Sequence, residues 1–186
     1  ELLEPAPGLT KAERDGVLRW FADYLRCMTT DANGIEEREA KNNHGTCWVT
    51  QVAAFARLTG DEERLAFCRG RFKTVLVPNQ VAADGSFPLE TARTKPYGYS
   101  LFNLDAMATA AWLLSTPGED LWRFDLPDGR GLRRAVAERH GLLDLEVSCD
   151  AAVFNTLLVF NRHELKEAEE LLRAARFFLG GERRRD

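Results

Sequence analysis

Apolar residues recur along most of the chain with the spacing of amphipathic helices. Near the N-terminus, Thr10 and Glu13 have the spacing of a capping box, and apolar positions follow at intervals of three or four residues as far as Met28. This pattern predicts a helix over that segment. Asn33-Gly34 is a dipeptide typical of turns, so we expect the chain to turn there before a charged stretch.

A second helical pattern covers residues 46–58 and ends at Gly60, a residue suited to a helix C-terminus. Asp61 is a good N-cap for another helix, which we expect to run until Pro78 stops it. The connection between the two helices is very short. Residues 46–77 are therefore predicted to form an antiparallel helical hairpin.

The stretch 79–96 contains Gly85, Pro88 and Pro96 and has no clear period, so we expect a long ordered loop with a functional role. Helical patterns resume after it. Further helices are predicted over residues 97–115, 130–140, 150–162 and 164–179.

Successive hairpins of this kind predict an all-α fold. No run of alternating apolar and polar residues is long enough to suggest a sheet. Stacked helix pairs are typical of an (α/α) toroid, an incomplete barrel or a solenoid. We expect residues 1–186 to form a single domain that is part of a full toroid.

Composition excludes some classes of protein. Apolar residues make up 45% of the chain and charged residues 29%, which is ordinary for a globular domain. No apolar run approaches the roughly 18 residues that span a bilayer, so no membrane partner is expected. The net charge of −4 argues against binding nucleic acid, although the local field in a cleft can differ in sign from the whole.

The cysteine and histidine residues do not have the spacing of a metal site. They are Cys27, Cys47, Cys68 and Cys149, with His44, His140 and His163. None of the cysteines forms a Cys-x-x-Cys pair, so neither a zinc site nor another metal or cofactor is predicted. Isolated buried thiols are the favoured interpretation, and disulfides in a secreted protein remain the alternative.

Three polar clusters stand out: Asn42-Asn43-His44-Gly45 at the start of a predicted helix, Arg93-Thr94-Lys95 late in the loop, and Tyr97-Gly98-Tyr99 at the entrance to the next helix. Taken singly, they read as a helix cap, a solvated basic loop and core packing. Taken together, they supply an amide, an imidazole, a guanidinium and a phenol.

These groups are the ones needed to break a uronic-acid chain by β-elimination. The reaction removes the C5 proton next to a carboxylate and expels the sugar oxygen at C4. An amide or guanidinium must stabilise the enolate-like intermediate, a base must take the proton, and an acid must protonate the leaving oxygen. Tyrosine can do both proton transfers if nearby positive charge, such as Arg93, lowers its pKa from about 10.

Three stretches together resemble the alginate lyase superfamily, most closely polysaccharide lyase family 38 and more distantly family 5. They are Lys41-Asn-Asn-His-Gly-Thr46, Gly85-Ser-Phe-Pro-Leu-Glu-Thr-Ala-Arg-Thr94 and Tyr97-Gly-Tyr-Ser-Leu-Phe-Asn-Leu104. The resemblance covers roughly residues 11–125, and its strength lies in the order and spacing of the motifs. It implies an (α/α) toroid with a substrate cleft, and a lyase acting on alginate or glucuronan.

The resemblance also implies catalytic roles. Asn43 would neutralise the substrate carboxylate, and His44 would assist or act as base. Arg93 would hold the substrate and lower the pKa of Tyr99, which would be the catalytic acid. In mannuronate and glucuronate the C5 proton and C4 oxygen share a face, so Tyr99 can also be the base. In guluronate they lie on opposite faces, and His44 would then be the base.

A second set of residues is expected around the substrate. Lys41 and Lys95 would add a local basic patch, and Tyr97 would stack on a sugar ring. Glu90 would orient Arg93 or anchor the loop, and Asn103 would bind substrate or cap the loop. Gln51 lies two turns after His44 on the same helix face, so it would line the cleft. Trp48 is assigned to core packing in preference to sugar stacking.

Two other interpretations stay open at this point. One is a non-catalytic domain that binds polyuronates, and the other is a helical-repeat interaction domain. For the lyase and for the binding domain, the expected partner is an anionic polysaccharide. Proteins of these two kinds meet their polymers outside the cytoplasm. The resemblance therefore implies a secreted or periplasmic protein, while the oligomeric state is not predicted.

Overall fold

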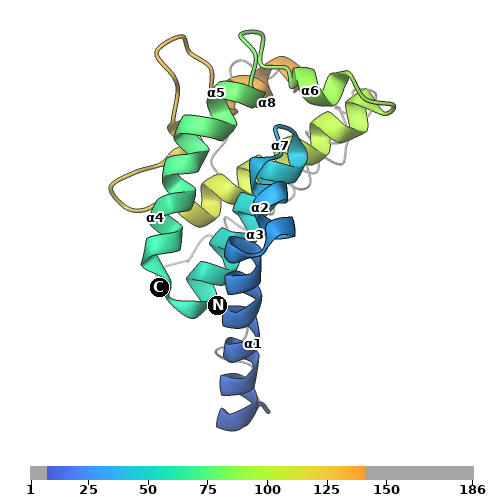
Figure 1. Cartoon of the computed structure of the whole chain (residues 1–186). Coiled ribbons are helices and arrows are strands. Elements are labelled where there is room, and N and C mark those ends of the chain that lie inside the picture. The colour runs from blue at the N-terminus through green and yellow to red at the C-terminus, as the bar shows by residue number, and fades with distance from the viewer. Residues whose placement is uncertain (1–7, 141–186) are drawn as a thin grey trace, which may run out of the picture.

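The computed structural model describes residues 8–140, with side chains described as far as residue 136, and that part of the chain is helical (Figure 1). The α-helices are α1 (Lys11–Thr30), α2 (Ala32–Glu39), α3 (Asn43–Thr59), α4 (Glu62–Arg71), α5 (Val77–Gln80), α6 (Pro88–Thr91), α7 (Pro96–Leu114) and α8 (Leu132–His140). A π-helix (Phe72–Leu76) and a 3-10 turn (Leu121–Arg123) complete the set. Residues 8–140 contain only two isolated β-bridges and no strand, which confirms the all-α prediction.

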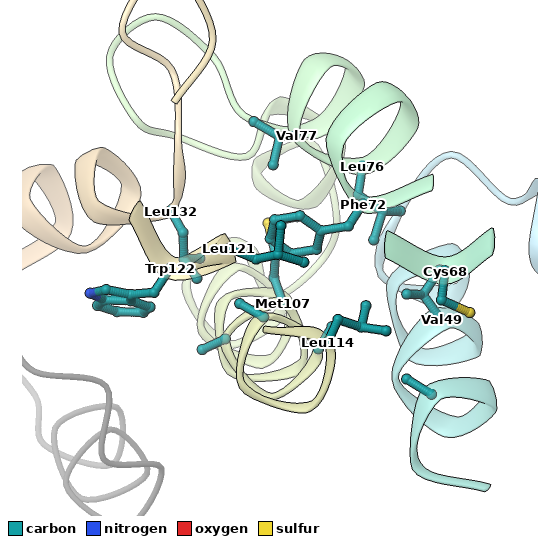
Figure 2. Close-up of a cluster of buried hydrophobic side chains, with 14 of the residues drawn as sticks. Val49, Cys68, Phe72, Leu76, Val77, Met107, Leu114, Leu121, Trp122 and Leu132 are labelled. Carbon is teal, nitrogen blue, oxygen red and sulfur yellow. The ribbon is translucent and has the colours of Figure 1, made fainter. Parts of the chain in front are cut away.

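Helix α3 lies at the centre of the described part and packs against α1, α2, α4 and α7. Its inner face is small and apolar, with Val49, Val52 and Ala53 fully buried. Figure 2 shows side chains from α3, α7 and the α4–α5 segment meeting in one cluster with Leu121 and Leu132. Each large side chain buried in this way stabilises the fold by about 1.5–3 kcal/mol.

The predicted connection between α3 and α4 is confirmed in detail. Gly60 ends α3 in the left-handed conformation, with φ at 73°. The Asp61 side chain then accepts a hydrogen bond from the backbone N–H of Arg64, which caps α4. The capping box of α1, formed by Thr10 and Glu13, is present as well.

The prediction that Pro78 stops the helix is wrong. Helical backbone continues from α4 through the π-helix into α5, and Pro78 lies in the first turn of α5. A proline lacks the N–H that a regular helix would use, and the wider π turn before it lets the chain pass without that bond. The chain therefore leaves the helix only at Val81.

The turn predicted at Asn33-Gly34 is also wrong, because both residues lie inside α2. The chain bends instead at Asp31, which has extended backbone between α1 and α2. A Cβ atom on Gly34 would lie 2.3 Å from the backbone oxygen of Met28. The glycine is needed for the close approach of α2 to the end of α1, and not for a turn.

The stretch 79–96 is irregular for most of its length, as predicted, but it also contains the short helix α6. Gly85 has a φ of 82°, and Phe87 is buried and fixes this segment to the core. The helices predicted over residues 150–162 and 164–179 lie outside the described residues, as does Cys149.

Three cysteines fall within the described residues, and all three are free thiols. Cys68 is buried, and this burial raises the pKa of its thiol to about 12. The prediction of an isolated buried thiol is thus confirmed for Cys68, whereas the free thiols of Cys27 and Cys47 are exposed and half-buried, respectively. No helix within residues 8–140 has the length and apolarity needed to cross a membrane.

The packing of α2 on α1 predicts that Gly34→Ala lowers the free energy of unfolding by about 1–3 kcal/mol, as overpacking does. Thermal or denaturant unfolding would measure the change. Gly70→Ala in α4 is the matched control, since a Cβ there meets nothing within 4 Å. It should leave stability unchanged or raise it by about 0.5–1 kcal/mol. Equal effects of the two substitutions would contradict the close approach.

Candidate active site

The three polar clusters lie at the start of α3, just after the end of α6, and at the start of α7. Asn42 is the N-cap of α3, and its side chain accepts a hydrogen bond from the backbone N–H of His44 at 3.2 Å. The helix-cap interpretation is therefore right for Asn42. Asn43 is different, because its side chain is buried and points to other partners.

Glu90 is the residue that joins these clusters. Its side chain is 1% exposed, and its Oε1 accepts a hydrogen bond of 2.6 Å from the backbone N–H of Asn43. Its Oε2 accepts another, of 3.2 Å, from Nη1 of Arg93. The start of a helix favours a negative charge, and Arg93 supplies a positive one. Glu90 thus both orients Arg93 and anchors the loop, which are the two roles considered for it.

Local structure explains why Glu90 and Arg93 lie together. Pro88 occupies the first turn of α6, where a missing N–H costs nothing, and the turn that follows includes a backbone hydrogen bond from Arg93 to the Glu90 carbonyl. Residues three apart in such a turn share one face. The spacing within the second motif therefore has a structural basis.

The side chain of Asn43 is oriented by Arg93. Its Oδ1 accepts a hydrogen bond of 3.0 Å from Nη1 of Arg93. A guanidinium only donates, so the oxygen must face Arg93 and the amide NH₂ must face away. Among the described residues this NH₂ makes no hydrogen bond, which leaves two donors for an anion.

Arg93 also contacts Tyr99, in the first turn of α7. The Cζ atom of Arg93 lies 3.5 Å from the centroid of the Tyr99 ring, so the guanidinium stacks on the phenol face. Both side chains are partly exposed. Asn43, Glu90, Arg93 and Tyr99 therefore form one continuous set of contacts drawn from three elements.

His44 points to a different partner. Its Nδ1 lies 2.8 Å from Oε2 of Glu37 in α2, and both side chains are about half exposed. An ionised carboxylate can only accept, which assigns the proton of a neutral imidazole to Nδ1 and leaves the lone pair on Nε2. Sequence reasoning missed Glu37, because no periodicity links α2 to α3 across the Asn42 cap.

A pocket of about 400 Å³ opens beside His44, between α1, α2 and α3. Gln51 also lines it, from the same face of α3 as His44. Trp48 borders it too, but its side chain is buried and its Nε1 donates to the backbone oxygen of Met28 at 3.0 Å. The core-packing assignment of Trp48 agrees with this burial.

A family model for alginate lyases matches residues 1–138. The chain belongs to the alginate lyase family. The structure of an alginate lyase from Bacteroides ovatus is similar, with 28% sequence identity and a TM-score of 0.72. The alignment covers 97% of this chain and 47% of that one, so the chain spans about half the length of this relative. No curated protein matches the chain.

The family membership agrees with the all-α fold and with a helical toroid. The three motifs on which the resemblance rested lie within residues 41–104, inside the matched range. Among the described residues, no group of three or more His, Cys, Asp or Glu side chains could hold a metal ion.

A second layer of buried polar groups supports the site from below. Gln80, at the end of α5, accepts hydrogen bonds from Thr46 at 3.0 Å and from the amide of Asn103 at 2.8 Å. It donates one of 3.2 Å to the backbone oxygen of Asn42. Asn103 has no exposed surface, so it lies beneath the site in this structure and not at its rim. Gln80 was not predicted.

The remaining predicted residues lie at the surface. Lys41, Lys95 and Tyr97 are exposed, and Tyr97 is 43% exposed. Lys95 and Tyr97 flank Pro96, at the start of α7. Arg93 thus contacts Asn43, Glu90 and Tyr99, while His44 and Gln51 line the adjoining pocket.

The pairing at Glu90 predicts that Glu90→Gln lowers the free energy of unfolding by about 1–3 kcal/mol. The new amide can still accept from Asn43, but it loses the charged partner of Arg93. This loss of stability should be smaller than that from breaking a fully buried ion pair, because the Arg93 side chain is 29% exposed and can be hydrated. Denaturant unfolding would measure it, with the exposed Glu36→Gln as control. An unchanged midpoint for Glu90→Gln would contradict this account.

Proposed function

We propose that this chain carries the catalytic part of a polysaccharide lyase that cleaves a uronic-acid polymer, alginate or glucuronan, by β-elimination. The observation that supports this most is the contact set in which Arg93 holds Asn43 on one edge and stacks on Tyr99. Family membership adds to it. The similar Bacteroides ovatus protein is described as an alginate lyase. The proposed partner is therefore an anionic polysaccharide.

Asn43 is assigned to the substrate carboxylate. Its NH₂ faces away from Arg93, so two hydrogen-bond donors are fixed in position before substrate arrives. Donors that are fixed in advance stabilise the enolate-like intermediate without a cost for reorganising them. His44 follows Asn43 directly in the chain and can share the same carboxylate when it is protonated.

Tyr99 is assigned to the proton transfers. To act as base, Tyr99 must be present as the phenolate, and the positive guanidinium of Arg93 stacked on its ring favours this charged form. The phenolate takes the C5 proton and becomes a neutral phenol. The same hydroxyl then returns a proton to the leaving oxygen at C4. This sequence suits mannuronate and glucuronate, in which the two positions share a face.

His44 is assigned to the base in guluronate, in which the C5 proton lies on the opposite face. The hydrogen bond to Glu37 keeps the lone pair on Nε2, as a base requires. Glu37 would therefore act as a positioning residue for His44. At the rim of the site, we assign substrate binding to Lys41, Lys95 and Tyr97.

We also propose that the protein works in the periplasm or outside the cell, where such polymers occur.

The first test is absorbance of the unsaturated uronate product, with polymannuronate, polyguluronate and glucuronan as substrates. Tyr99→Phe should lower kcat by at least about 100-fold on every polymer that the wild type cleaves, because it removes the transferable proton. Tyr97→Phe is the matched control, since it deletes an exposed hydroxyl two residues away and keeps the ring. Product from Tyr99→Phe at the wild-type rate would rule out the assigned acid.

No product from the folded wild type on all three polymers would overturn the alginate or glucuronan assignment. Binding of the polymers without turnover would then favour a non-catalytic polyuronate-binding domain. If the protein neither cleaves nor binds these polymers, only the assignment of the helical fold would remain.

Because Tyr99 and His44 are assigned as bases for different uronates, His44→Ala should change which polymer the enzyme prefers. Cleavage of polyguluronate should fall about 100-fold or more, as expected on loss of a general base. Cleavage of polymannuronate should fall less, because Tyr99 remains. Glu37→Ala should shift the ratio in the same direction. Equal losses on the two polymers would instead assign His44 to carboxylate binding alone.

A further inference from the structure

The pocket beside His44 is lined on its other sides by residues that none of the proposed catalytic steps uses. It lies where the C-terminal half of α1 faces α2 and α3, and it has a volume of about 400 Å³. His44 and Glu37 form one wall, next to the proposed reacting centre. The opposite wall belongs to α1, where Tyr24 reaches into the lining.

Tyr24 is an exposed aromatic side chain that is nonetheless fixed in place. It keeps 40% of its surface exposed, while its ring packs against Phe55 with centroids 5.3 Å apart and against Trp20 with centroids 5.4 Å apart. A ring supported from behind presents a flat apolar surface at little cost in side-chain entropy. Such a surface suits the C–H face of a pyranose ring.

Short polar groups complete the lining. The amides of Asn33 and Gln51 lie on α2 and α3, both are exposed, and each offers donors and an acceptor. An apolar platform with a few amides beside it is the usual composition of a small-molecule site. A sugar would stack one face of its ring on the tyrosine, and the amides would form hydrogen bonds with the hydroxyl groups at the ring edge.

The charges in the pocket set the orientation of a bound sugar. Asp31 and Glu37 both line it, and they would repel a carboxylate. A uronate unit would therefore enter with its hydroxyl edge inward and its carboxylate toward solvent. The carboxylate that is to be neutralised belongs to a different unit, the one held by Asn43.

We propose that this pocket is a separate sugar subsite that binds the unit adjacent to the one being cleaved, with Tyr24 as the stacking platform and Asn33 and Gln51 on the hydroxyl groups. The assignment of the sugar as part of a uronate chain rests on the proposed function. Because Tyr24, Asn33 and Gln51 take part in none of the assigned proton transfers, they contribute to substrate binding and leave the chemical step unchanged.

Tyr24→Leu tests the subsite through a split between KM and kcat. With long polymannuronate, KM should rise about three- to tenfold, as expected for loss of one aromatic stacking contact, while kcat stays within about twofold. With the shortest oligomer that is cleaved, whose chain leaves the pocket empty, KM should not change. Tyr24→Phe should behave as wild type, because it keeps the ring.

Trp112→Leu is the control, because Trp112 is as exposed as Tyr24, at 43%, but lies in a different pocket at the far end of α7. It should leave both constants unchanged. An unchanged KM for Tyr24→Leu, or a fall in kcat of equal size on long and short substrates, would overturn the proposal. Unfolding midpoints of all three variants exclude general loss of structure.

Binding separates this proposal from the proposed function. Titration calorimetry of an oligomannuronate with Tyr99→Phe, and with the same variant carrying Tyr24→Leu, measures affinity without turnover. Weaker binding in the second protein supports the subsite even if no polymer is cleaved by the wild type. Equal binding overturns the subsite even if the wild type is an active lyase, and absence of binding in both overturns it as well.

Discussion

The site depends on a single buried carboxylate, that of Glu90. Removing a carboxylate from water costs several kcal/mol unless partners replace the lost hydration. Here the replacement comes from two directions, the backbone N–H at the start of α3 and the guanidinium of Arg93. The N–H of Asn43 is within reach only when α3 and α6 are in register, whereas Arg93 lies three residues after Glu90 in the same segment. The charge that is costly to bury therefore fixes α6 and the turn with Arg93 against the start of α3, and the stacking of Arg93 on Tyr99 extends these contacts to α7.

Gln80 extends this constraint into the core. Its side chain joins Thr46 of α3, Asn103 of α7 and the carbonyl of Asn42, so the cap of α3 is held from below as well as from Glu90. Gln80 reaches this position only because the helix continues past Pro78. Had the chain left the helix before the proline, the amide would lie elsewhere and the buried groups of Thr46 and Asn103 would lose a partner. The π turn and the polar layer are thus parts of one arrangement.

The features that the sequence predicted well are local ones. The capping box at Thr10, the glycine end at Gly60 and the cap at Asp61 each involve residues a few positions apart, so their patterns are visible in the chain. Gly34 and Pro78 were misread because their roles are set by a neighbouring helix or by a π turn, which no short window contains. Glu37 and Gln80 were missed for the same reason. The convergence of Asn43, Arg93 and Tyr99 was expected from the family resemblance, since periodicity alone does not bring residues 50 positions apart into contact.

Asn43 and His44 illustrate how one helix start can serve two sides of a substrate. Successive residues on a helix point about 100° apart, so neighbours in sequence face different surroundings. Asn43 turns toward Arg93, whereas His44 turns toward Glu37 and lines the pocket that Tyr24 also lines. Under the proposed function, a sugar held by Asn43 would lie between a phenol on one side and an imidazole on the other. In such a pose a proton acceptor would lie on either face of the ring, and uronates of both configurations at C5 would be substrates of one site.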